Sequence, residues 1–317
     1  MKHTFLAIAA ALILAGSAQA ETVKLAVPQK GTWDTSIPEW GAKQGYFKDQ
    51  GIDLAITYTE GGATTEQAVI GGSVDVAIAT GILGMVSAYV KGAPVRIISA
   101  EVTGVPDMYF FALASSGIKS LQDAHGKTIA YSNPGSSSNL VTLALLKAAG
   151  ITDAKPVAGG AIQSIFTQVM SGQIDIGHAT PPIGLAELKA GKIVVVARGN
   201  DVPDIRNQTV RVNAANADYL AAHRDTVVRF MKAYDKSLNF AFSGDPKVVQ
   251  YFAEGLNVSP ELAREAMKFY SKDAQNPFVI KGLDLTLRDA LAFKRIPKPM
   301  TPDDFKGMID IVWKPGQ

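Results

Sequence analysis

One segment of this chain is repeated 100 residues later. Residues 68–80 (AVIGGSVDVAIAT) align without gaps with residues 168–180 (QVMSGQIDIGHAT), and five aligned positions are identical. Two upstream pieces match in the same order: 61–63 with 159–161, and the strand pattern at 24–27 with that at 127–131. Ordered matches at a nearly constant offset indicate a duplicated unit, and the period is far too long for a solenoid. The repeat therefore predicts two lobes built on one plan.

The apolar pattern within each unit alternates between strand and helix periods. In the first unit strands are expected at 23–27, 52–58, 74–79 and 95–101, with helices at 38–48, 64–70 and 84–91. A further strand at 109–114 precedes a restart of the same order at 128–132. Such alternation gives a mostly parallel sheet covered by helices. We predict a two-lobed α/β fold with a cleft between the lobes.

The last third of the chain has a helical pattern. Apolar residues follow helical spacing from Asp225 to Ala241, Asp245-Pro246 and Ser259-Pro260 are typical of helix starts, and a last helix is expected at 300–311. We assign 21–108 with 206–317 to the first lobe and 109–205 to the second. Crossovers near 101–109 and 198–210 would then form a hinge.

The first twenty residues have the pattern of a secretory signal peptide. A basic start, Met1-Lys2-His3, precedes an apolar run from Phe5 to Gly16, and Ala18-Gln19-Ala20 is a small-x-small cleavage site. The run is shorter than the roughly 20 residues that cross a bilayer, which disfavours the alternative of an uncleaved anchor. Cleavage after Ala20 predicts an exported protein. Without a cysteine for lipid attachment, it is expected to diffuse in the periplasm.

Composition excludes several function classes. Lys plus Arg is 31 and Asp plus Glu is 29, so no strong field attracts nucleic acid or an anionic membrane. The chain has no cysteine and four scattered histidines, which argues against thiolate metal sites, a Cys nucleophile and a metal or other cofactor. No nucleophile, base and orienting group occur together, so we expect no enzyme activity.

The repeat also suggests where the cleft lies. Gly72 and Gly172 stand where a helix stops and a strand begins, so a positive φ is expected at both, and Asp75 and Asp175 are expected to bind backbone donors nearby. Thr80 and Thr180 fall at the carboxyl ends of strands, where open α/β sheets bind ligands. Capping of the next helix is the alternative role of each threonine.

A serine-rich loop is the strongest ligand-binding candidate. Residues 132–139 (SNPGSSSN) follow a strand and precede an apolar helical stripe, so Ser136 and Ser137 are expected at a helix start, where free N–H groups bind anions or carbonyl oxygens. In the equivalent loop Trp33 either stacks on a flat ligand or packs over the core edge. Alternation puts Tyr109 on the opposite strand face from Phe110, and one face is expected to border the cleft.

Other candidates are single polar side chains. A buried arginine could clamp a carboxylate or sulfonate, although surface exposure is the default for each, and those nearest the crossovers are Arg96, Arg198, Arg206 and Arg211. His178 lies on a second-lobe strand, where a hydrogen-bonded core role is the commoner one.

A family resemblance lies in the export signal, the opening GYFKDQGIDL (45–54) and the two GGSVDVA-like turns. In these features the chain resembles the substrate-binding proteins of ABC importers, within the group that serves taurine, alkanesulfonates, nitrate and thiamine-pyrimidine precursors. The resemblance implies a type II periplasmic binding protein, monomeric, that closes on one small molecule and docks on a membrane permease driven by a cytoplasmic ATPase. Position by position, it implies a cleft lined by Trp33, Gly62, Thr80, Gly81, Ser136, Ser137, Gly160 and Thr180. Intracellular pyrimidine synthases of the same family carry a Cys-rich iron site, which this chain lacks.

Alternatives for function and ligand stay open at this point. A periplasmic sensor component or a secreted enzyme could use the same fold. Serines at a helix start and nearby arginines favour a sulfonate or carboxylate, whereas Trp33 and Tyr109 favour a planar or pyrimidine-like ligand. An aromatic acid would use both features.

Overall fold

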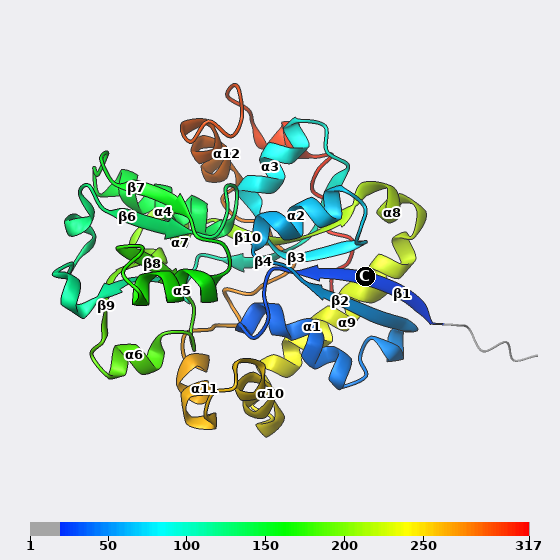
Figure 1. Ribbon diagram of the computed structural model, residues 1–317. Helices are drawn as coiled ribbons and strands as arrows, with labels where there is room; N and C mark the ends of the chain where they lie inside the picture. Colours follow the sequence, from blue (N-terminus) through cyan, green and yellow to red (C-terminus); the bar gives the residue numbers. More distant parts are fainter. Residues whose placement is uncertain (1–19, 317) are drawn as a thin grey trace, which may run out of the picture.

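The computed structural model describes residues 20–316 as two lobes, each built on a five-stranded sheet flanked by helices (Figure 1). The predicted signal peptide lies outside the described residues, apart from Ala20 at its end. In the first lobe the strand order is β2 (Ile52–Tyr58), β1 (Glu21–Val27), β3 (Val76–Gly81), β10 (Thr209–Asn216) and β4 (Val95–Thr103). In the second it is β7 (Lys155–Ala158), β6 (Thr128–Tyr131), β8 (Ile176–Ala179), β5 (Tyr109–Leu113) and β9 (Ile193–Arg198).

Both sheets are mixed and have the same plan. Three strands on one side are parallel, and the fourth strand, β10 or β5, runs antiparallel to both neighbours. The chain crosses from one sheet to the other between Thr103 and Tyr109 and returns between Arg198 and Thr209. The two-lobed α/β fold is thus confirmed, with sheets more mixed than expected. The limits assigned to the lobes stay a prediction.

Helices cover the sheets and the side of the molecule near the carboxyl terminus. Those of the first lobe's αβ units are α1 (Trp33–Lys43), α2 (Gly62–Ile70) and α3 (Ile82–Val90). Those of the second lobe and the return crossover are α4 (Ser137–Ala148), α5 (Ile162–Met170), α6 (Leu185–Lys189) and α7 (Pro203–Arg206). The remaining helices are α8 (Ala217–Ala222), α9 (Arg224–Ala241), α10 (Pro246–Leu256), α11 (Pro260–Met267) and α12 (Leu283–Ala292). Asp245 and Ser259 cap α10 and α11 as predicted.

Two of the expected helices were wrong. The first helix begins at Trp33 rather than Pro38, because Pro38 is accommodated inside α1. No α-helix occupies 300–311 among the described residues: a 3-10 turn at Pro302–Phe305 is followed by a bridge from Ile309 to Ile97 of β4. The apolar residues there add an edge to the first sheet instead of forming a helical stripe.

The repeated turns have equivalent structures in the two lobes. Gly72 and Gly172 have φ angles of +70° and +75°, as predicted. Asp75 accepts a hydrogen bond from the backbone N–H of Lys24 at 2.8 Å, and Asp175 accepts one from that of Thr128 at 2.8 Å. Each aspartate therefore holds the neighbouring strand, at Lys24 of β1 and at the start of β6, which is a structural role.

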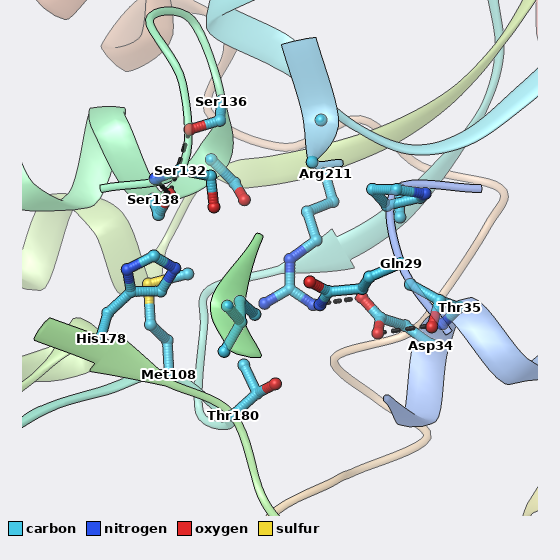
Figure 2. A pocket seen from close by; sticks show the side chains of 16 residues that line it. Gln29, Asp34, Thr35, Met108, Ser132, Ser136, Ser138, His178, Thr180 and Arg211 are labelled. Atoms are coloured by element: carbon cyan, nitrogen blue, oxygen red, sulfur yellow. Dashed lines mark hydrogen bonds and ion pairs between the residues drawn. The ribbon is translucent and has the colours of Figure 1, made fainter. Parts of the chain in front are cut away.

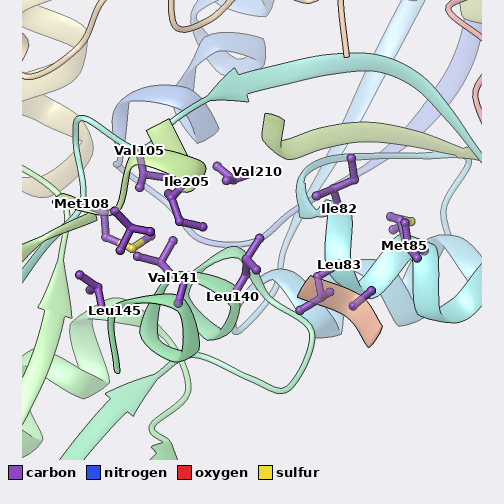
Figure 3. Close-up of a cluster of buried hydrophobic side chains, with 14 of the residues drawn as sticks. Ile82, Leu83, Met85, Val105, Met108, Leu140, Val141, Leu145, Ile205 and Val210 are labelled. Atoms are coloured by element: carbon purple, nitrogen blue, oxygen red, sulfur yellow. The ribbon is translucent and has the colours of Figure 1, made fainter. Parts of the chain in front are cut away.

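One hydrophobic cluster crosses from lobe to lobe (Figure 3). Ile82 and Leu83 of α3 belong to the same buried cluster as Leu140 and Val141 of α4. The crossovers contribute to it as well, through Val105, Met108, Ile205 and Val210. We call this set the apolar seam. It holds the lobes together on the α3–α4 side of the cleft.

Candidate functional site

A cavity of about 40 Å³ lies between the lobes (Figure 2). Its volume accommodates about three water molecules, so the two lobes lie close to each other around it. The polar side chains that line it are Gln29, Asp34, Thr35, Ser132, Ser136, Ser137, Ser138, His178, Thr180 and Arg211.

The first turns of four helices face this cavity. Asp34 and Thr35 begin α1, Gly62 begins α2, Ser137 begins α4 and Ile162 begins α5. By the sequence repeat, α5 is the counterpart of α2, and α4 stands where α1 stands in the first lobe. The first N–H groups of a helix have no intrahelical acceptor and carry partial positive charge. The duplicated plan thus brings the starts of four helices to one cavity.

The serine loop is shaped by its own hydrogen bonds. Ser136 caps α4 by accepting from the backbone N–H of Asn139 at 3.2 Å, and Ser138 accepts from that of Ser132 at 2.9 Å. No hydrogen bond of the Ser137 hydroxyl is found within residues 20–316, although Ser137 lines the cavity. Of the three hydroxyls, that of Ser137 is therefore the one left for a ligand.

Arg211 forms one wall, and protein carboxylates already compensate its charge. Its terminal nitrogens pair with Asp34 and, at 2.8 and 3.0 Å, with both oxygens of Asp107. All three side chains are buried. Burial raises the pKa of Asp107. Burial also raises the pKa of Glu101 well above its usual value, and the carboxylates of Asp34 and Asp107 act in the same direction. In this arrangement Arg211 organises the cavity wall rather than offering an uncompensated charge.

His178 is a neutral polar group in the opposite wall. The side chain is 1% exposed, and its Nδ1 lies 3.3 Å from the carbonyl oxygen of Ala130. Burial lowers the pKa of His178 to about 4, and the nearby charge of Arg211 acts in the same direction. The imidazole is therefore unprotonated at neutral pH.

The structure brings together four of the nine residues named from the sequence. Gly62, Ser136, Ser137 and Thr180 line the cavity. The hydroxyl of Thr180 is buried and has no hydrogen-bond partner within the described part of the chain. Gly62 lies across the cleft from Ser136, since a Cβ built on it would be 3.7 Å from that of Ser136.

The other five lie elsewhere in the described structure. Trp33 is a core residue: its Nε1 donates to Gln275 at 3.0 Å, and its ring stacks on that of Tyr270. Thr80 donates to the carbonyl of Val212, and Tyr109 donates to that of Ile183. Gly81 lies beneath the serine loop and donates its N–H to Glu66, and Gly160 precedes α5 outside the cavity wall.

Sequence reasoning missed the pairing of Arg211 with Asp34 and Asp107. These residues are 177 and 104 positions apart from Arg211. Their ion pairs depend on strand order, which the periodicity did not give. One signal was available in the sequence: Asp34 directly follows Trp33, in the segment equivalent to the serine loop.

A curated relative and two solved structures are similar to the chain over most of its length. A binding protein of Brucella abortus is 26% identical over 262 residues, which cover 81% of this chain and 79% of the relative. The periplasmic aliphatic sulphonate binding protein SsuA of Escherichia coli superposes with a TM-score of 0.72 at 19% identity, covering 94% of this chain and 93% of SsuA. The periplasmic nitrate-binding protein NrtA of Synechocystis PCC 6803 gives a TM-score of 0.72 at 12% identity, with coverages of 93% and 87%.

These likenesses establish the periplasmic binding protein fold. No helix among residues 20–316 combines the length and apolar character of a membrane span. The family model described as NMT1/THI5 like matches residues 40–247, about two thirds of the sequence and nearly all of both sheets. On that match, this chain belongs to the NMT1/THI5-like family.

Proposed function

We propose that this protein is a periplasmic solute receptor, which binds one small organic ligand between its lobes and delivers it to an ABC permease. The observation that carries the proposal is the convergence of four helix starts, two from each lobe, on one cavity. Only a closed arrangement joins donors from both lobes around one ligand. Export with cleavage after Ala20 and a monomeric state belong to the same proposal.

The ligand is proposed to carry an anionic or carbonyl group that faces the start of α4. Helix N-termini and serine hydroxyls donate hydrogen bonds to such groups without requiring a free cation. Sulfonates, carboxylates, aromatic acids and pyrimidine-like solutes all offer a suitable acceptor. We infer that Gly62, Ser136, Ser137 and Thr180 surround it, because they line the cavity.

A thermal-shift screen tests the receptor function. The protein is unfolded and refolded to remove carried-over solute, and is then heated with sulfonates, aliphatic and aromatic carboxylates, nitrate or thiamine pyrimidines. A ligand at about 100 times its Kd adds roughly 2.7 kcal/mol, or about 5 to 10 °C. One chemical class is expected to raise Tm without being consumed on prolonged incubation. Turnover of a bound solute would contradict the proposal.

Delivery is tested separately, with the permease and its ATPase in proteoliposomes. The liganded receptor is expected to stimulate ATP hydrolysis and to bring labelled solute into the vesicles. A bound solute that is never transported would favour a sensor instead.

A further inference from the structure

We propose that His178 determines which solutes the cleft accepts: its Nε2 accepts a hydrogen bond from the ligand, so the cleft selects solutes that carry an N–H or O–H donor. The inference rests on the proposed receptor function and deepens it. It separates donor-bearing solutes from those with acceptors only, such as nitrate or an unsubstituted alkanesulfonate.

The hydrogen bond to Ala130 fixes the tautomer of His178. A carbonyl oxygen can only accept, so the Nδ1 that lies 3.3 Å from it must carry the proton. In the neutral ring Nε2 is then an acceptor with a free lone pair. Figure 2 shows the imidazole at the edge of the cavity with one ring nitrogen turned toward it.

The surroundings keep His178 neutral and in place. It is 1% exposed on β8, and the ring of Phe110 on the paired strand lies 6.0 Å away between centroids. Burial and the positive charge of Arg211 both disfavour a protonated imidazole. The ring therefore presents an acceptor, and not a cation, to whatever enters the cavity.

Thr180 gives a second, independent indication of a ligand on this wall. It follows β8 directly, lines the same cavity and is 4% exposed. Its Oγ1 is buried without a hydrogen-bond partner of normal length among residues 20–316, and the nearby Tyr270 hydroxyl donates to the carbonyl oxygen of Pro181. A buried hydroxyl is normally paired, so a hydroxyl in a residue of the cavity wall can complete its pairing with a ligand. His178 and Thr180 thus oppose the donors at the start of α4 with a wall that can accept.

The two walls together define the ligand class. One end of the solute bears an acceptor or anion for the N–H and hydroxyl groups of α4, and another part bears a donor for His178. Hydroxy- or amino-substituted sulfonates and carboxylates meet both demands, as do aminopyrimidines.

Calorimetric titration of matched solutes tests this selection. The probes are ethanesulfonate with 2-hydroxyethanesulfonate, benzoate with 4-hydroxybenzoate, and 2-methylpyrimidine with 4-amino-2-methylpyrimidine. In the pair that binds between the lobes, the donor-bearing member is expected to bind at least about tenfold more tightly at pH 7.5, because its partner leaves Nε2 unpaired. In His178→Phe the preference is expected to fall below about threefold through weaker binding of the donor-bearing member.

Two further variants control for indirect effects. His178→Gln keeps an acceptor oxygen in similar space and is expected to retain part of the preference. It also serves if the phenylalanine variant does not fold. His125→Gln changes an exposed histidine of the same lobe, paired with Asp153 at its surface, and is expected to leave both affinities unchanged.

The outcomes separate the inference from the function on which it rests. Equal binding of both members of the fitting pair, or a preference that survives in His178→Phe, would overturn the inference and leave the receptor function standing. If none of the probes binds the wild type, the receptor function fails for these solute classes and the inference with it. Nitrogen NMR of the ligand-free protein adds a direct check: a proton on Nε2 instead of Nδ1 overturns the proposal.

Discussion

Arg211 ties the first turn of α1 to the first crossover. It lies on β10, pairs with Asp34 of α1 and binds both oxygens of Asp107, which lies between β4 and β5. The gain from such buried pairs is offset by desolvation, so their net contribution to stability is small. Losing one partner is different, because the remaining charges stay buried without compensation.

Arg211→Met should therefore destabilise the fold strongly. It leaves Asp34 and Asp107 facing each other without a cation, and we expect the free energy of unfolding in urea to fall by about 3 to 5 kcal/mol. Arg264→Met is the matched control, since Arg264 is exposed and its ion pair with Glu261 lies at the surface. The control should cost less than about 1 kcal/mol. Equal losses in the two variants would contradict this account of Arg211.

At the scale of elements, the start of α3 meets the loop before α4 backbone to backbone. The N–H of Gly84 donates to the carbonyl oxygen of Gly135 at 3.1 Å, across the cleft. A Cβ built on Gly81 would lie 2.5 Å from the same oxygen, closer than real side chains approach a backbone. The φ of Gly81 is −75°, so its own conformation suits any residue. The absence of a side chain there serves the approach of the two lobes.

Gly81→Ala should consequently hinder closure without disturbing the first lobe. The added methyl group meets only backbone of the second lobe, which must move away. We expect ligand affinity to fall at least about tenfold, equivalent to 1.4 kcal/mol, with a larger radius of gyration in X-ray scattering. Gly71→Ala is the control, because its methyl group would contact the carbonyl of Gln67 in its own helix. Unchanged affinity and scattering in Gly81→Ala would show that the lobes tolerate the wider spacing.

At the scale of the molecule, the two sides of the cleft are held differently. The apolar seam joins the lobes beside α3 and α4. On the other side, α6 and α11 meet through Lys189 and Glu265, whose charged ends are 2.7 Å apart and whose side chains are 61% and 36% exposed. Leu185 of α6 is also buried in a cluster of the first lobe, and the Tyr270 hydroxyl donates to the carbonyl oxygen of Pro181. An exposed ion pair is worth about 0 to 1 kcal/mol, and one buried leucine with one hydrogen bond adds less than the several aliphatic side chains buried in the apolar seam. The cleft is therefore expected to open on the α6–α11 side.

Distance measurements between these two helices test the opening. The chain has no cysteine, so Lys189→Cys with Glu265→Cys provides two unique sites for spin labels. Without ligand the distance distribution should be broad and reach larger values, and a saturating ligand should narrow and shorten it. Labels at Asp49 and Lys236, which pair within the first lobe, should not respond. A ligand-independent distance between α6 and α11 would place the motion elsewhere.

The sequence predicted what depends on local pattern. Turn chemistry accounts for the positive φ of Gly72 and Gly172 and for the backbone contacts of Asp75 and Asp175. The strand period accounts for the placing of Phe110 on the opposite sheet face from Tyr109 and Phe111. The serine loop was found in the same way, because helix starts have a recognisable composition.

The remainder of the site depends on which strands are neighbours. Trp33 was predicted as a possible ligand contact because the first helix was expected to begin only at Pro38. The helix begins about one turn earlier, at Trp33, and the Trp33 ring therefore packs in the core. The acceptor role of His178 needs Ala130 on an adjacent strand, 48 positions away. Glu66, whose pKa is raised well above its usual value by burial, accepts from the N–H of Gly81 within the first lobe, and it meets Gly135 of the serine loop only when both lobes are assembled.

The apolar seam bears on how far each half of the repeat can exist alone. Leu140, Val141 and Leu145 are buried in one cluster with side chains of the other lobe, so a fragment limited to residues 109–205 would expose them to water. Two segments that share a plan therefore also share part of an interior. Each half thus buries apolar surface that the other half would otherwise leave exposed to water.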